Sequence, residues 1–205
     1  MFMTKSRPGR ATMAGFSLVE LMVGSVIGLI VIGAVTALVL SMMRSNRQTL
    51  QATRLNQELR ATLAVIANDI KRARSVEDPF TIATAAGGNP YEVVDSSTAG
   101  CVRYAYSGGP GGDWRSIRRD TTNQRLVLSA GAAQANATCA TTGTELGSDQ
   151  VLITAFDIQP AVSSATARRY DITITGRLND PDSELSGITR TMRQTVFIRS
   201  IGDGT

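Results

Sequence analysis

The chain of 205 residues has no histidine and only two cysteines, and each of these absences excludes a kind of chemistry. Without histidine, the Ser-His and Cys-His pairs of nucleophilic catalysis cannot form. Two cysteines without histidine cannot complete a zinc site either. For Cys101 and Cys139 two alternatives stay open: a disulfide, which an oxidising compartment favours, or two buried thiols. Since no carboxylate pair stands out at helical spacing in the C-terminal part, we expect neither an enzyme nor a bound cofactor.

Proline is missing between Pro8 and Pro79, which allows one long helix over residues 16–74. In residues 44–74, apolar positions recur every three or four residues, and this spacing predicts an amphipathic helix against one side of a domain. Basic residues at 71, 72 and 74 suit the C-terminal end of that helix. A coiled-coil seam is the alternative, but the run is short for one. The stripe consists of Leu55, Leu59, Leu63, Ile66, Ile70 and Ala73, and the opposite face carries Gln57, Arg60, Asn68, Lys71 and Arg72.

Charge is missing from residues 16–43, with the single exception of Glu20. The uncharged run from Leu21 to Met43 is long enough for a helix to cross a hydrocarbon core about 30 Å thick. A carboxylate is costly in lipid, so Glu20 is a candidate functional residue whose partner has to be found. Small residues at 24, 28, 33 and 34 let another helix approach closely, although membrane helices also tolerate glycine without such a partner.

Acidic residues are missing from the first 15 positions, which hold Lys5, Arg7 and Arg10. The positive-inside rule therefore places the N-terminus in the cytoplasm and the C-terminal part on the outer side of the inner membrane. The apolar segment is too long for an ordinary secretory signal and no A-x-A-like site follows it, so any cleavage must come before it. Without these first residues, 18 basic residues face 17 acidic ones. The net charge of +4 is thus largely a property of the leader, and we expect no nucleic-acid partner.

After Pro79 the pattern changes from helical to extended, with segments rich in Thr, Val, Ile and Tyr. These segments predict an antiparallel sheet that packs on the second half of the helix. The fold class is therefore α+β. The expected strands are 101–106, 114–119 and 124–129 as a meander, followed by 151–159, 170–175 and 195–200, the last two paired around a loop at 176–189.

Two motifs in this part have simple structural interpretations. The glycine-rich stretch 107–113 lacks the G-K-[ST] ending of a phosphate-binding loop and has no helix after it, so it is predicted to be a hairpin loop. Arg115, Arg118 and Arg119 form a small basic cluster. On a strand these side chains would point to both faces, and a solvated surface is the expectation for them.

An acidic turn offers the one metal candidate in the chain. Asp180, Asp182 and Glu184 alternate along N-D-P-D-S-E and could present oxygen atoms to calcium. The glycine and the terminal glutamate of an EF-hand loop are missing, so a solvated acidic turn is favoured over a calcium site.

The start of the chain resembles the class III signal of type IV prepilins, on the basic leader, Gly15, Phe16 and the run S-L-V-E-L-M-V. The resemblance covers residues 15–43. It implies that prepilin peptidase cuts between Gly15 and Phe16 on the cytoplasmic face and that Phe16 becomes N-methylated. Glu20 would then be the fifth mature residue, which in this family pairs with the N-terminal amine of a neighbouring subunit.

The resemblance also implies a type IV pilin-like fold and a division of the chain. Its long N-terminal helix spans the membrane in its first half and packs on the C-terminal antiparallel sheet in its second. We expect a cleaved cytoplasmic leader at 1–15, a transmembrane and filament-core half of the helix at 16–43, an amphipathic half at 44–74, and a periplasmic β-rich domain at 75–205.

The rest of the chain resembles the minor pilins of the PilW kind and the type II secretion pseudopilins of the GspJ kind, on residues 59–72, 114–119 and 195–200. Ala37 stands where major pilins often carry proline, and the cysteines are not at the extreme C-terminus. A minor pilin of an initiation or tip complex is therefore expected, with other major and minor pilins as partners in an extracellular pilus. The alternatives are a pseudopilin in a periplasmic pseudopilus, and a membrane-anchored periplasmic adhesin, enzyme or DNA-binding pilin.

Overall fold

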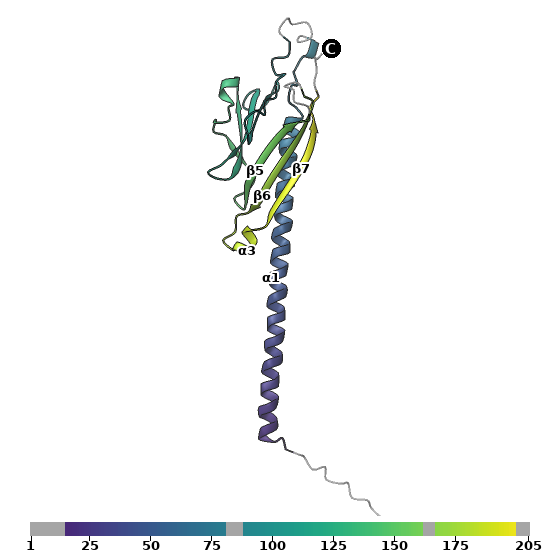
Figure 1. Cartoon of the computed structure of the whole chain (residues 1–205), viewed down its shortest axis with the longest axis vertical. Coiled ribbons are helices and arrows are strands. Elements are labelled where there is room, and N and C mark those ends of the chain that lie inside the picture. Colours follow the sequence, from purple (N-terminus) through teal and green to yellow (C-terminus); the bar gives the residue numbers. More distant parts are fainter. Residues whose placement is uncertain (1–14, 81–87, 162–166, 200–205) are drawn as a thin grey trace, which may run out of the picture. The chain divides into compact units, whose positions relative to one another are not determined.

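A computed structural model describes residues 15–80, 88–161 and 167–199, without the side chains of Ser183 and Glu184. The chain divides into two compact units, residues 1–47 and residues 48–205. The long helix α1 (Leu18–Ile70) belongs to both units, and the strands follow it in the second unit (Figure 1). The predicted α+β class is therefore confirmed.

In the described part of the chain the strands form two antiparallel sheets rather than the single sheet that was predicted. The first sheet has the strand order β1-β2-β3-β4, and the second has the order β5-β6-β7. Two short helices, η1 (Gln134–Asn136) and α3 (Ser183–Ser186), lie in the connections. The strands are β1 (Cys101–Ala105), β2 (Trp114–Asp120), β3 (Arg125–Gly131), β4 (Thr144–Leu146), β5 (Val151–Pro160), β6 (Arg169–Leu178) and β7 (Thr189–Phe197).

The core of the second unit is built on the predicted stripe of α1. All six stripe residues are buried, while the five polar residues predicted for the opposite face are exposed. On β6 every second residue from Tyr170 to Leu178 is buried, as expected for a strand with one face against a core. At Gly176 a Cβ atom would lie 2.9 Å from Cδ2 of Leu59, so helix and strand approach closely there. The amphipathic half of the helix thus packs on a sheet, as predicted.

The two sheets are joined through β2 and β5. The Arg119 side chain donates a hydrogen bond to the Ile153 carbonyl at 2.8 Å, and the Ile153 amide donates one to the Gln124 carbonyl at 2.6 Å. Apolar side chains of both sheets, among them Ile117 and Phe156, belong to the same core as the helix stripe. Both sheets therefore share one hydrophobic core.

The helix ends at Ile70, four residues before the predicted end at residue 74. Beyond Ile70 the chain makes tighter turns, in which the amide of Ala73 bonds the Ile70 carbonyl at 2.9 Å. Arg74 then adopts the left-handed conformation with φ of 68°, and its amide donates to the Ala105 carbonyl at 2.8 Å. The contact with the end of β1 replaces the hydrogen bond that would have continued the helix.

The strand predictions are confirmed in position but not in length. β1 lacks Tyr106, and β7 begins at Thr189, six residues before the predicted start. The early part of β7 is exposed and polar, so it has no apolar alternation to mark it as a strand. β4 was not predicted at all, because its three residues carry no periodic signal. The hairpin of β6 and β7 is confirmed, with a shorter loop, and so is the glycine-rich hairpin loop between β1 and β2.

Candidate functional site

The predicted cleavage junction lies directly before α1. Gly15, Phe16 and Ser17 precede the first helical residue, and Phe16 is 84% exposed. A Cβ atom placed on Gly15 would meet nothing within 4 Å. The peptide bond between Gly15 and Phe16 is therefore open to an enzyme. Cleavage at this bond and methylation of Phe16 stay predictions.

Glu20 occupies the first turn of α1 and is exposed. It has no ion-pair partner among the residues that the structure describes. A carboxylate near the N-terminus of a helix interacts favourably with the helix dipole, but this interaction is only a few tenths to about 1 kcal/mol at an exposed position. The pairing of Glu20 with an amine stays a prediction.

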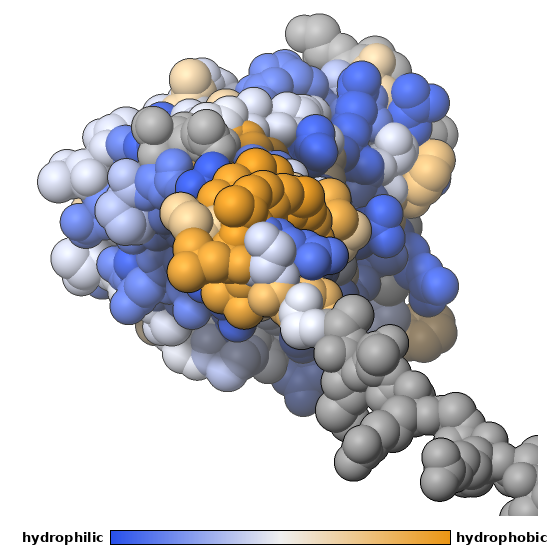
Figure 2. Space-filling view, turned by 90° about the horizontal axis from the view of Figure 1, so that it is seen from below, coloured by the Kyte–Doolittle hydropathy of each residue, from blue (hydrophilic) through white to orange (hydrophobic). Residues whose placement is uncertain are grey.

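The helix surface beyond Glu20 is apolar and uncovered. Seen from its N-terminal end, the first half of α1 presents hydrophobic side chains (Figure 2). The helix is long and apolar enough to cross a membrane, and the most apolar stretch of it has no residue buried within the described chain. At Gly24, Gly28 and Gly33 a Cβ atom would meet nothing within 4 Å. Within the described chain, no contact therefore requires glycine at these positions.

Two polar side chains in this segment are hydrogen-bonded to the helix itself. The hydroxyl of Ser25 donates to the Met22 carbonyl and that of Thr36 to the Ile32 carbonyl, each at 2.8 Å. Such bonds let hydroxyls enter a medium without water. The first half of α1 is thus compatible with membrane anchoring.

Cys101 and Cys139 form a disulfide, with their Cα atoms 5.9 Å apart. This pairing decides between the two alternatives that the sequence left open. The bond ties the start of β1 to the loop after η1. A disulfide of this kind belongs to oxidising compartments.

The structure describes two of the three acidic side chains of the predicted calcium turn. Asp180 is half-buried and Asp182 is exposed, and the Asp182 amide donates to the Asp180 carboxylate at 2.9 Å. The side chain of Glu184 lies outside the described residues. Among the residues described, no group of three acidic or cysteine side chains could hold a metal ion. Calcium binding by this turn stays an untested prediction.

A polar cluster that the sequence reasoning missed lies at the end of α1. The Asp69 carboxylate accepts hydrogen bonds from the hydroxyls of Tyr104 and Tyr106, the latter at 2.6 Å. Burial raises the pKa of Tyr104 well above its ordinary value, and it raises the pKa of Tyr106 to about 12, with Asp69 adding to both shifts. Both tyrosines are thus held as neutral hydroxyl donors to the helix carboxylate.

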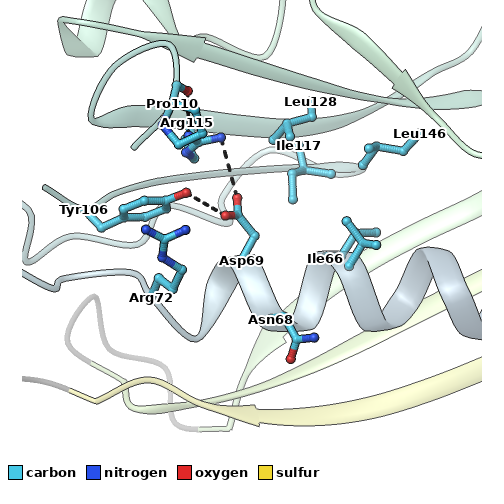
Figure 3. A pocket seen from close by; sticks show the side chains of 11 residues that line it. Ile66, Asn68, Asp69, Arg72, Tyr106, Pro110, Arg115, Ile117, Leu128 and Leu146 are labelled. Carbon is cyan, nitrogen blue, oxygen red and sulfur yellow. Dashed lines mark hydrogen bonds and ion pairs between the residues drawn. The ribbon is translucent and has the colours of Figure 1, made fainter. Parts of the chain in front are cut away.

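Arg115 belongs to the same cluster, so its predicted place on a solvated surface is wrong. Its side chain is 4% exposed and its Nη1 lies 3.9 Å from the Asp69 carboxylate (Figure 3). Its Nη2 donates to the Pro110 carbonyl at 2.7 Å. The guanidinium groups of Arg115 and Arg72 lie over the ring of Tyr106, at 4.9 Å and 4.4 Å from its centre. The carboxylate and the aromatic ring are what allow Arg115 to be buried.

A signal for this cluster was present in the sequence. Asp69 lies three residues after Ile66 and four before Ala73, so it borders the buried stripe of the helix. Tyr104 and Tyr106 share one face of the first strand with Val102, which is in the core. An acid next to the stripe and two tyrosines on a core-facing strand predict a buried hydrogen-bond network.

A cleft of about 440 Å³ opens beside this cluster, between α1 and the first sheet (Figure 3). One end of it is polar, with Asp69, Arg72, Arg115 and Tyr106. The rest is mostly apolar, and such a lining is typical of binding sites for partly apolar groups. The other lining residues are Val65, Ile66, Asn68, Pro110, Ile117, Leu128 and Leu146.

Comparison with protein families gives two matches that together cover the junction and the second unit. Residues 48–198 match the family described as Prepilin peptidase-dependent protein B. Residues 10–36 match the Prokaryotic N-terminal methylation motif. No curated protein and no solved structure matched the chain.

Proposed function

Because the chain belongs to the family of prepilin peptidase-dependent protein B, we propose that it is a minor pilin, which prepilin peptidase processes and which enters a type IV pilus. The observation that carries this proposal is the arrangement of the junction. Gly15 and Phe16 are exposed directly before α1, and Glu20 lies in its first turn. All three residues fall within the match to the methylation motif at residues 10–36.

Processing would change the charge balance at the end of the helix. Cleavage after Gly15 removes Lys5, Arg7 and Arg10 and leaves an amine on Phe16, which prepilin peptidase then methylates. The new amine stands four residues before Glu20. The mature end therefore holds one cation and one anion, both next to an apolar helix surface.

Glu20 would dock a neighbouring subunit by charge pairing. A carboxylate that enters an apolar environment needs a cation at short range, and removing one member of such a pair is strongly unfavourable. In a fibre whose core consists of the apolar helix halves, the neighbour's Phe16 amine is the cation that the sequence provides. The pair would then fix the axial register of one subunit against the next rather than add net stability.

The membrane topology of the precursor follows from the same residues. We infer that the basic leader stays in the cytoplasm, that the first half of α1 crosses the inner membrane, and that residues 75–205 are periplasmic. The disulfide between Cys101 and Cys139 supports an oxidising location for these residues. No site for catalysis is proposed.

Within the fibre we place the chain in an initiation or tip complex. Ala37 in place of the proline of major pilins supports a minor role. The equivalent place in a type II secretion pseudopilus is the alternative, and the proteins that copurify with the chain distinguish the two.

Intact mass tests the proposal. The protein is purified from cells with prepilin peptidase and from cells without it. We expect the first sample to begin at a methylated Phe16 and the second to retain the 15-residue leader. An unprocessed chain in both samples would overturn the proposed function. A Gly15→Leu variant is the matched control, because it should keep the leader even when the peptidase is present.

A further inference from the structure

The groove considered for binding consists of the cleft beside Asp69 and a second hollow next to it along α1. A second hollow of about 300 Å³ is lined by Glu58, Val65, Leu146 and neighbouring residues. Val65 and Leu146 line both hollows, so the two lie next to each other at this point. From Glu58 to Asp69 the helix rises about 17 Å. An extended peptide of about five residues has this length.

The middle of the groove is apolar and partly open to solvent. Val65 is 52% exposed, although it lies on the part of α1 that packs on the sheets. Leu128 and Leu146 are only partly buried and contact the edge of the core. An occupant that covers these side chains would remove apolar surface from water, at about 25 cal/mol per Å².

At the Asp69 end of the groove, the carboxylate already accepts hydrogen bonds from within the chain, whereas arginine N–H groups remain that could donate to an occupant. The Asp69 carboxylate is already bonded by Tyr104 and Tyr106. Arg115 is 4% exposed, and its Nε has no hydrogen-bond partner among the described residues. Buried donors of this kind are rare in folded proteins. Arg72 is exposed, and its guanidinium lies over the Tyr106 ring.

The other end of the groove is formed by the Glu58 carboxylate, which already has hydrogen-bond donors. The Glu58 carboxylate accepts bonds from the amide and the hydroxyl of Ser148, at 2.6 and 2.7 Å. The end at Asp69 therefore holds two cations, Arg72 and Arg115, and one carboxylate. The end at Glu58 holds one carboxylate that already accepts hydrogen bonds. An occupant with an acceptor that carries negative charge fits the first end.

We propose that this groove receives an apolar segment of a neighbouring pilin-like subunit, whose carboxylate meets Arg72 and Arg115. The inference rests on the proposed function, which places such subunits next to this chain. The length and the apolar middle of the groove suit a peptide segment better than a small ion. The position of the cations fixes its direction, with the acidic residue at the Asp69 end.

Photo-crosslinking in cells that assemble the fibre tests the groove. The full-length chain carries p-benzoyl-phenylalanine at Val65, and the matched control carries it at Ala64, which is exposed but lines neither hollow. We expect the Val65 probe, and not the Ala64 probe, to capture a segment of another pilin-like subunit that contains Asp or Glu. Capture of lipid alone, of a second copy of this chain, or of a segment without an acid would overturn the proposal.

Charge reversal tests the role of the cations. Arg72→Glu should lower the Val65 crosslink yield at least about fivefold, because attraction becomes repulsion. Lys71→Glu makes the same charge change one residue away, outside the groove lining, and should keep the yield within about twofold. Replacing the captured acid by lysine in the partner should restore crosslinking to Arg72→Glu. Equal losses in the two variants, or none in Arg72→Glu, would contradict the proposal.

The failure of this inference can be told apart from failure of the proposed function. A chain that is processed and enters the fibre, but gives no crosslink from Val65, overturns the groove proposal alone. A chain that keeps its leader in every strain overturns the proposed function, and the groove proposal with it.

Discussion

The carboxylate of Asp69 on α1 accepts a hydrogen bond of 2.6 Å from the hydroxyl of Tyr106, at the start of the glycine-rich hairpin loop. This bond ties the last turn of the helix to the first sheet. Since Arg115 of the next strand lies 3.9 Å from the same carboxylate, one side chain connects three segments. The end of the helix is therefore held by a polar network as well as by its apolar stripe.

Asp69→Asn should lower the free energy of unfolding by about 2 kcal/mol, because the buried Arg115 loses its counter-charge. Chemical denaturation of the full-length chain in detergent measures the loss. Glu77→Gln is the control, as Glu77 is exposed and outside the network. Equal stabilities of the Asp69→Asn and Glu77→Gln variants would show that the ion pair contributes nothing.

Alkaline pH should destabilise the fold. The pKa of Tyr106 is raised from 10.0 to about 12, mainly by burial, and that of Tyr91 is raised to about 12, mainly by its hydrogen bond to Asp113. Between these values the unfolded chain releases protons that the folded chain keeps. The contribution of these two tyrosines to the free energy of unfolding should therefore be constant below pH 10. It should fall as the pH rises towards 12.

Denaturation at several pH values, with phenolate absorbance as a second signal, checks this slope. The Tyr106→Phe variant is the control, because it removes one of the shifted groups and should make the slope shallower. If the free energy of unfolding falls equally steeply with pH in both proteins, Tyr106 does not contribute to the loss of stability.

Loss of the disulfide should lower the free energy of unfolding by about 4 kcal/mol in the chain-entropy model, since Cys101 and Cys139 are 38 residues apart. The Cys101→Ser, Cys139→Ser double variant measures this by denaturation. A reducing agent should have the same effect on the native chain and none on the double variant. A native chain that is insensitive to reduction, with accessible thiols before reduction, would argue against the bond.

Gly112→Ala should be far more damaging than Gly108→Ala, although both glycines have positive φ in the same loop. At Gly112 the new Cβ would lie 2.3 Å from the Gly131 carbonyl carbon, whereas at Gly108 it meets nothing within 4 Å. We expect a loss of about 1 kcal/mol for Gly108→Ala and several kcal/mol for Gly112→Ala. Thermal unfolding of the two variants side by side gives the comparison, and equal melting temperatures would contradict it.

Glu20→Ala should permit processing but prevent normal entry into the fibre, because the junction at Gly15 is unchanged while the docking charge is lost. Glu20→Asp is the matched control and should retain part of the function. Intact mass reports processing, and the amount of the chain in sheared fibres reports incorporation. Normal incorporation of the Glu20→Ala variant would contradict the docking role.

The elements that the sequence predicts well are those whose residues repeat with one period. The stripe from Leu55 to Ile70 predicted the buried face of α1, because helical periodicity depends only on local spacing. β4 and the start of β7 were missed, because each is polar and takes its strand conformation from the neighbouring strand. Arg74 shows the same limit, since its turn depends on a contact with Ala105.

The candidate site divides in a similar way. The junction around Gly15 and Glu20 could be predicted, because a processing signal is read as a linear stretch of chain. The place of Arg115 beside Asp69 was not predicted, since the two residues come from segments about 45 residues apart and meet only through the packing of helix on sheet. For the same reason Arg115 was assigned to a solvated surface.

The hydroxyls of Ser25 and Thr36 carry their acceptors with them, one turn back along the same helix. For a subunit that moves from a bilayer into a protein fibre, this means that these two hydrogen bonds do not have to be exchanged on the way. Lipid chains and neighbouring helices are then nearly equivalent surroundings for residues 21–43. The difference in free energy between the two environments then depends chiefly on Glu20, the one acidic side chain at the start of the helix, and on whether a cation lies beside it.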